Sequence, residues 1–243
     1  MSALEEAART LWPPAGDRHG PLPPLLVALT FVTGVVDAAS YLRLGHVFVA
    51  NMTGNIVFLG FALAGASGVS GVTSLAALAS FLAGASAGGW LIARTPDHRG
   101  HLLRGASACQ ASLMAIAVII AGTASEPLQS GARYAVLVPL ALAMGVQNAS
   151  AQRLAVPELT TTVLTRTLTG IASEAGTLGG TGSKLGRRVV AVSAMLLGAL
   201  TGGLLALKVS VAAALAVAFA IVLAVGLAVH LLSSRSPEAW TRP

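Results

Sequence analysis

Six stretches of the chain are long and apolar enough to cross the hydrocarbon core of a lipid bilayer, which takes about 20 residues of α-helix. Only 10% of the 243 residues are charged, whereas soluble domains carry about 25%. The sequence therefore predicts an all-α, polytopic membrane protein whose surroundings are a lipid bilayer. The six predicted spans cover residues 24–42, 71–93, 105–124, 134–150, 189–207 and 209–232.

The predicted spans form a single integral membrane domain over residues 24–232. Residues 1–23 are polar and proline-rich, as in "WPPAGDRHGPLPP", and predict a flexible cytoplasmic tail. Residues 233–243 predict a second cytoplasmic tail. The net charge of +6 fits membrane loops enriched in Lys and Arg, so we expect no nucleic-acid partner.

Two further segments, residues 47–66 and 156–175, are harder to interpret. The first carries no charge and is long enough to span, whereas the second contains Glu158, Arg166 and Glu174. A charge at the centre of a membrane helix costs at least about 2.5 kcal/mol. We therefore interpret both segments as broken or re-entrant.

Sequence matches between the two halves predict an internal repeat. "GASAGGWL" at 84–91 matches "GALTGGLL" at 198–205, and "AASYLRL" at 38–44 matches "NASAQRL" at 148–154. Thr53 falls opposite Thr165 at a similar offset. The repeats would cover about residues 24–124 and 134–232, each with three spans and one broken segment. Because three is odd, the halves would have opposite orientations, which is typical of secondary transporters.

The distribution of positive charge favours six spans with both termini in the cytoplasm. This topology places twelve of the fifteen Lys and Arg residues inside and three outside, whereas eight spans would place six inside and eight outside. A seven-span topology, in which only 47–66 crosses, gives eleven against four, so charge alone leaves it open. The repeat favours treating the two broken segments alike.

Asp37 is the first candidate functional residue, because an ionisable group inside a membrane span is costly and indicates function by default. It predicts a proton carrier, a cation ligand or an ion pair, and a structural pairing with Arg43 is the alternative. The nearby "NMTGN" contributes Asn51, Thr53, Gly54 and Asn55. A helix that begins there would direct free N–H groups at a polar ligand, unless these residues only satisfy the helix break.

The second half contributes Gln147, Asn148 and Thr165 to the predicted site. Gln147 and Asn148 lie opposite Asp37 and Ala38 in the repeat, which suggests a shared central site. Hydrogen bonding between helices is the alternative explanation. Arg166 needs a partner, and the candidates are Glu174, Glu158 and Asp37.

Glycines at GxxxG spacing predict two close helix contacts. They are Gly84 with Gly88, and Gly198 with Gly202. The sequence has no phosphate-binding loop, no GxSxG or HExxH motif and no acidic cluster suited to a metal. We therefore expect no enzymatic activity, no cofactor and no metal.

Three motifs carry a family resemblance: "TGVVDAASYL", "GHVFVANMTGN" and "MGVQNASAQRL" with its following "TTVLT". They resemble the YoaK-like family of bacterial multi-pass membrane proteins, a domain of unknown function, over about residues 24–232. The resemblance implies a bacterial inner-membrane protein and names no substrate. Arg166 departs from the pattern, because it stands where a glycine would repeat Thr53–Gly54.

These observations favour a transporter or permease for a small polar or ionic solute, with a central polar site. The alternative is a non-transporting scaffold or sensor in which the polar residues are structural, and a membrane enzyme is a third reading. The substrate is not specified by the sequence, and a homo-oligomer is compatible with it.

Overall fold

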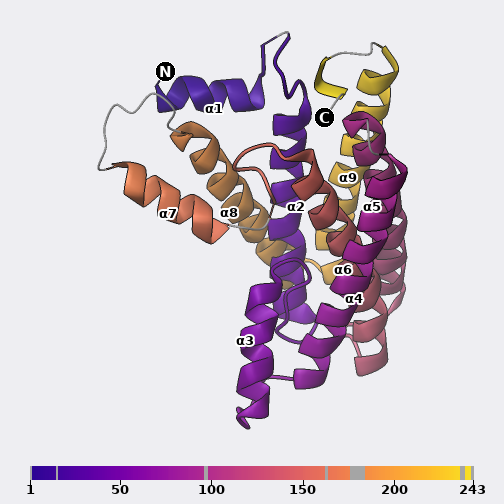
Figure 1. The fold of residues 1–243 in the computed structure, drawn as a ribbon. Coiled ribbons are helices and arrows are strands. Elements are labelled where there is room, and N and C mark those ends of the chain that lie inside the picture. The colour runs from indigo at the N-terminus through magenta and orange to yellow at the C-terminus, as the bar shows by residue number, and fades with distance from the viewer. Residues whose placement is uncertain are drawn as a thin grey trace.

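The computed structural model is a bundle of α-helices (Figure 1) and describes residues 2–14, 16–95, 98–161, 164–175, 184–235 and 239–241. Six helices are long and apolar enough to cross a membrane, which confirms the predicted polytopic all-α class. No strand occurs among the described residues. The six helices are α2 (Leu22–Arg43), α4 (Gly71–Arg94), α5 (Arg99–Thr123), α6 (Ser130–Leu154), α8 (Leu185–Lys208) and α9 (Val211–Arg235).

Several spans begin or end beyond their apolar segments, because polar residues at the ends satisfy the helix termini. Helix α5 begins at Arg99, six residues before the predicted span, and His98 accepts a hydrogen bond from the backbone N–H of His101 at 3.0 Å. Ser70 caps α4 in the same way through Thr73 at 3.2 Å. Side-chain caps of this kind satisfy N–H groups that have no partner inside the helix.

The two doubtful segments contain short helices, α3 (Met52–Leu63) and α7 (Leu164–Ala175), each of 12 residues. Twelve residues of helix are about 18 Å long, which is well short of the hydrocarbon thickness of about 30 Å. Neither short helix can therefore span a bilayer alone. Figure 1 shows α3 at the bottom of the view and α7 higher up, at the side of the bundle next to α8.

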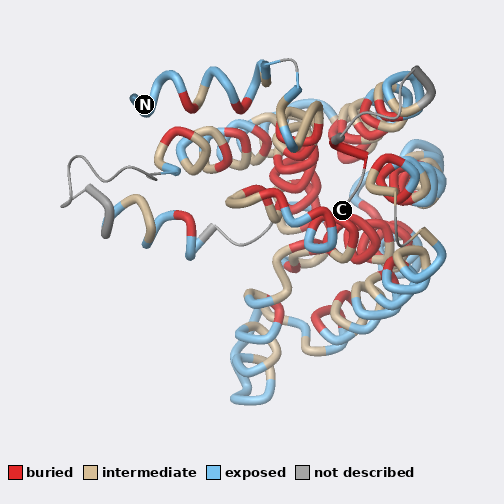
Figure 2. Tube along the Cα trace, turned by 45° about the horizontal axis from the view of Figure 1, so that its top comes forward, coloured by how far each residue is buried: buried red, intermediate tan, exposed pale blue. Residues whose placement is uncertain are grey.

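Helices α2 and α6 are the most buried of the six and lie at the centre (Figure 2). Helix α2 packs on α8, and α6 packs on α4. Glycine permits both contacts: a Cβ atom at Gly198 would lie 2.1 Å from the Phe31 carbonyl oxygen, and one at Gly84 would lie 2.1 Å from that of Leu142. Gly202 and Gly88 extend the same two contacts towards Val35 and Val146. The four glycines predicted as packing positions therefore lie at backbone contacts between helices.

The N-terminal residues differ from the flexible tail that the sequence predicted. Helix α1 (Ala3–Leu11) begins with a capping box between Ser2 and Glu5 and lies on the start of α8. The Glu6 carboxylate accepts the backbone N–H of Gly186 at 3.0 Å, where negative charge is favourable near the start of a helix. The prolines that suggested a flexible tail follow α1, whereas the capping box in "SALE" stabilises the start of the helix before them.

The predicted C-terminal tail is also partly ordered against the bundle. Helix α9 continues to Arg235, and Trp240 of the short helix η1 (Ala239–Thr241) is buried. Its ring lies against Gly20, where a Cβ atom would be 2.6 Å from the indole. The residues before α2 and after α9 therefore meet at the same end of the bundle.

Candidate functional site

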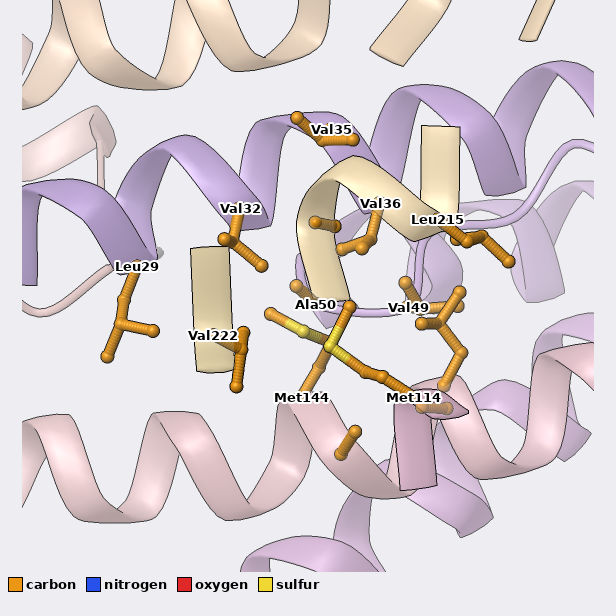
Figure 3. Close-up of a cluster of buried hydrophobic side chains, with 14 of the residues drawn as sticks. Leu29, Val32, Val35, Val36, Val49, Ala50, Met114, Met144, Leu215 and Val222 are labelled. Carbon is orange, nitrogen blue, oxygen red and sulfur yellow. The ribbon is translucent and has the colours of Figure 1, made fainter. Parts of the chain in front are cut away.

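The chain between α2 and α3 folds back into the buried core. Val47, Val49 and Ala50 are almost fully buried, and Figure 3 shows Val49 and Ala50 in the same cluster as Met114 and Met144. Non-helical backbone at membrane depth leaves N–H and C=O groups unpaired, and it is tolerated only when protein or water satisfies them. The non-helical segment therefore needs hydrogen-bond partners from neighbouring helices.

Asp37 supplies these partners. The backbone N–H groups of Val49 and Ala50 donate to its Oδ1 atom at 2.8 and 2.9 Å, and the side-chain amide of Asn51 donates to Oδ2. Only 3% of Asp37 is exposed. Hydrogen bonds to a carboxylate are about twice as strong as those between neutral groups. Asp37 therefore holds the broken segment in place.

Arg43 does not pair with Asp37, which was the structural alternative considered from the sequence. Its guanidinium donates to the carbonyl oxygen of Ala206 at 2.9 Å and to that of Leu207 at 3.5 Å. These are among the last carbonyls of α8, where a cation is favourable. The arginine therefore ties the end of α2 to the end of α8.

Asn55 also holds the broken segment in place, through two hydrogen bonds to Phe48. Its Oδ1 atom accepts the backbone N–H of Phe48 at 2.9 Å, and its Nδ2 atom donates to the Phe48 carbonyl oxygen at 2.6 Å. The Phe48 ring lies on Gly54, where a Cβ atom would be 2.6 Å from it. Thr53 is exposed. Asn51, Gly54 and Asn55 thus fold onto the residues before them, and Thr53 does not join them.

A separate polar cluster lies at the middle of the bundle. The Gln110 side chain on α5 donates to Gln147 Oε1 at 2.6 Å, and Gln147 Nε2 donates to Thr33 Oγ1 at 2.9 Å. All three residues are buried. Thr33 lies roughly 15 Å along α2 from either end at 1.5 Å per residue. Sequence reasoning missed Gln110 and Thr33, although an amide within an apolar span was a usable signal.

Asn148 does not join this cluster through its amide nitrogen, which donates to the Met144 carbonyl oxygen at 3.0 Å on its own helix. Thr165 and Arg166 are exposed on α7. The eight predicted site residues therefore do not form one central site. Asp37, Asn51, Gly54 and Asn55 belong to the broken segment and its contacts, and Gln147 belongs to the central cluster. The Asn148 amide bonds to Met144 on α6, and Thr53 and Thr165 are exposed.

The segment between α6 and α7 is fastened by an ion pair. Glu158 accepts from Arg188 on α8, with Nε 3.1 Å from Oε2 and Nη2 3.2 Å from Oε1. The hydrogen bond from Arg188 lowers the pKa of Glu158 below its ordinary value, and this outweighs the opposite effect of partial burial. Arg188 is thus the partner of Glu158, where the sequence suggested Arg166. The Glu174 side chain lies outside the described residues.

Two cavities lie at opposite ends of the bundle. One has a volume of about 380 Å³, and its polar lining includes His46, Ser70, Thr73, Arg133 and Tyr134. The other has a volume of about 220 Å³, and its charged or titratable lining consists of Arg18, His19, Arg99 and Arg153. Among the described residues no group of His, Cys, Asp or Glu is arranged to hold a metal ion.

Comparison with known proteins places the chain in a family. Residues 25–228 match the family described as "Protein of unknown function (DUF1275)". The chain is 31% identical over 150 residues to the UPF0700 transmembrane protein YoaK of Bacillus subtilis (strain 168), a match that covers 62% of this chain and 65% of that relative. The match thus spans slightly less than two thirds of the relative's length.

No solved structure matches the chain. The family match covers all six membrane helices except the last residues of α9 and the first of α2. The protein belongs to the DUF1275 family of YoaK-like membrane proteins.

Proposed function

We propose that the protein is a transporter or permease for a small polar or ionic solute, and that its two broken segments are gates at opposite faces of the membrane. The observation that carries the proposal is the paired arrangement of these segments. Each follows a central span, contains buried residues (Val49 and Ala50 in the first, Val156 and Leu159 in the second) and precedes a helix of 12 residues. Broken elements at matched positions of two halves are typical of secondary transporters.

A carboxylate fastens each segment to a spanning helix. Asp37 on α2 binds the segment before α3, and Glu158 in the segment before α7 binds Arg188 on α8. Such bonds hold a closed gate, and each is broken by protonating one acid or by a competing ion. The central cluster of Thr33, Gln110 and Gln147 provides polar groups at mid-depth between the gates.

We also propose that the halves are inverted repeats. Gly34 meets α8 at the Met195 carbonyl oxygen, and Gly145 meets α4 at that of Phe81, with hypothetical Cβ distances of 2.3 and 2.2 Å. Aligning these two glycines places Asn148 opposite Asp37, one residue away from the alignment suggested by "AASYLRL". The relation between α2 and α8 is thus repeated between α6 and α4.

The proposed orientation places both termini in the cytoplasm of a bacterial cell. Span ends on the face that carries α1 hold most of the cations, and the opposite face holds only Arg43, Arg133 and Lys208 among the described Lys and Arg residues. An excess of Lys and Arg marks the cytoplasmic side. The proposal assigns no catalytic chemistry to any of these residues.

A two-part experiment tests the proposal. Single cysteines replace His46, Ser70 and Ala155, all exposed, in a Cys109→Ser background, and membrane-impermeant maleimide is applied to each side of oriented vesicles. We expect His46→Cys and Ser70→Cys, which flank the broken segment, to react from one side and Ala155→Cys from the other. Solute counterflow into proteoliposomes, screened with small polar and ionic solutes, should then detect a flux that Asp37→Asn reduces and Thr53→Ala leaves unchanged.

The second candidate function is a scaffold or sensor without transport. It is favoured by one observation: the segment backbone and Asn51 already bind both oxygen atoms of Asp37, and Phe48 binds both polar atoms of Asn55. Loss of thermal stability in Asp37→Asn, with no solute flux in either wild type or variant, would favour this function. Labelling of His46→Cys and Ser70→Cys from opposite sides would show that 47–66 spans the membrane and would contradict the six-span topology that the proposal requires.

A further inference from the structure

The cavity of about 220 Å³ at the α1 end of the bundle is lined by cations from three separate parts of the chain. Arg18 and His19 precede α2, Arg99 begins α5, and Arg153 lies in the last turn of α6. Among the described residues that line it, none carries a carboxylate; Asp97, between Thr95 and Arg99, lies outside the described residues. The nearby Asp17 carboxylate accepts the backbone N–H of His19 at 2.7 Å. The described wall of this cavity is therefore predominantly positive.

Arg99 is held in position at the cavity wall. Its Nη2 atom donates to the Leu154 carbonyl oxygen and approaches His19 Nδ1 at 3.3 Å. Both contacts use the same nitrogen, so Nε and Nη1 keep donors for a further acceptor. One arginine is sufficient to cap the end of α6, and the cap does not explain why Arg18 and Arg153 also line the cavity.

The field of these arginines acts on His19. Burial, followed by the nearby cations Arg99 and Arg187 and more weakly Arg18, lowers the pKa of His19, and the Asp17 carboxylate acts in the opposite direction without reversing the shift. Histidine in this position is therefore stabilised in its neutral form, and it can accept or donate a hydrogen bond without adding charge. The cavity at the other end differs, because hydroxyl groups of Ser70, Thr73, Ser130 and Tyr134 accompany its single arginine.

We propose that the cavity formed by Arg18, His19, Arg99 and Arg153 binds a phosphate-class anion. Guanidinium groups match the geometry of phosphate oxygens through paired N–H donors. All four residues lie at the ends of spans, which is the depth of lipid headgroups, and basic pockets between membrane helices bind such headgroups. The phosphate is either that of an anionic lipid headgroup or a free anion. This inference does not depend on transport.

The test uses the full-length protein purified in a zwitterionic detergent. Its melting temperature is measured with inorganic phosphate, with phosphatidylglycerol and with phosphatidylcholine in the micelles. The variant Arg18→Gln/Arg153→Gln removes two exposed cations from the wall and leaves the Arg99 cap intact. The matched control Arg9→Gln/Arg94→Gln removes two cations from the same face that do not line the cavity.

We expect phosphate or phosphatidylglycerol to raise the melting temperature of wild type and control, and the cavity variant to bind roughly tenfold more weakly. A response to inorganic phosphate indicates a free-anion site, whereas a response to phosphatidylglycerol alone indicates a headgroup site. If the control Arg9→Gln/Arg94→Gln bound the probe as weakly as the cavity variant, the effect would be one of overall charge, and the proposal would be overturned. Absence of any shift in wild type with either probe would overturn it as well.

Discussion

The Asp37 carboxylate on α2 accepts a hydrogen bond from the side-chain amide of Asn51, 14 residues later at the start of α3. The same carboxylate accepts the backbone N–H groups of Val49 and Ala50. Three donors thus converge on one buried acid, and they explain why a charged residue lies inside an apolar helix. A break in the chain at membrane depth leaves backbone donors unpaired, and the aspartate pairs them.

Exchanging the two side chains tests this relationship. Asp37→Asn leaves one neutral acceptor oxygen where two carboxylate oxygens served three donors, and Asn51→Asp places two carboxylates together. Each single change should therefore destabilise the protein by about 2 kcal/mol or more. The double variant Asp37→Asn/Asn51→Asp restores one donor and one acceptor. We expect it to recover about 1–2 kcal/mol, near the upper end for hydrogen bonds between membrane side chains.

Unfolding in mixed micelles, followed as a double-mutant cycle, measures this coupling. Additive effects of the two single changes would show that the side chains do not interact in the folded protein. Thr53→Ala is the control, because Thr53 belongs to the same motif and is exposed. It should change the free energy of unfolding by less than about 0.5 kcal/mol.

The central amide cluster gives a second cycle. Gln147→Leu removes the oxygen acceptor of the buried Gln110 amide and leaves it only the weak contact with the Met144 sulfur at 3.9 Å, which costs about 1–3 kcal/mol. Gln110→Leu similarly leaves Gln147 Oε1 without its 2.6 Å donor. We expect Gln110→Leu/Gln147→Leu to be less destabilising than the sum of the single variants, because it removes both partners. A double variant that costs more than this sum would contradict the pairing.

Adjacent glycines on α8 provide a matched pair for the close helix contact. A Cβ atom at Gly202 would lie 2.4 Å from the Val35 carbonyl oxygen, whereas at Gly203 the nearest atom, Leu42 Cδ1, is 3.6 Å away. Gly202→Ala should therefore destabilise the protein by about 1–3 kcal/mol through overpacking. Gly203→Ala should be neutral or stabilising, because alanine favours helix by about 1 kcal/mol over glycine. Thermal unfolding in detergent distinguishes them, and equal effects would place the α2–α8 contact elsewhere.

The Glu158–Arg188 ion pair predicts a pH dependence. The pKa of Glu158 is lowered in the folded protein, chiefly by the hydrogen bond from Arg188. Its contribution to stability is therefore complete above the pKa of an unfolded glutamate, about 4.3, and is lost as the pH falls through the lower folded value. Wild type should lose more stability than Glu158→Gln between about pH 5 and pH 3. Parallel curves for the two proteins would show that the pair contributes nothing.

The spans were predictable from sequence because apolar length is a local property, and the structure differs from the prediction mainly at polar ends such as Arg99. The partners of polar residues were harder to predict. Glu158 and Arg188 lie 30 residues apart on elements that meet only after folding. Arg166 was the nearer candidate in sequence, but its side chain is exposed on α7.

The amides illustrate a second limit. Gln147 was identified because it lies near the end of an apolar helix, whereas its partner Gln110 lies in a span that otherwise reads as lipid-facing or packing surface. The pairing of Gln110 with Gln147 depends on which sides of α5 and α6 meet, and the repeat did not predict that. Asp37 was found for the right physical reason, the cost of a buried acid, but its partners proved to be the neighbouring backbone and Asn51.

Each central helix packs on a helix of the other half, α2 on α8 and α6 on α4, and this has a consequence for biosynthesis. Helix α2 leaves the ribosome early, yet the helix on which it packs, α8, begins only at Leu185. At about 5–20 residues per second, α2 waits on the order of ten seconds for that partner. Asp37 finds its partners soon after α2 is made, in residues 49–51, but until α8 is made Gly34 lacks the backbone of α8 on which it packs. The growing chain must therefore keep α2 in a protected place beside the insertion machinery, and the bundle closes around α2 only after α8 has been made.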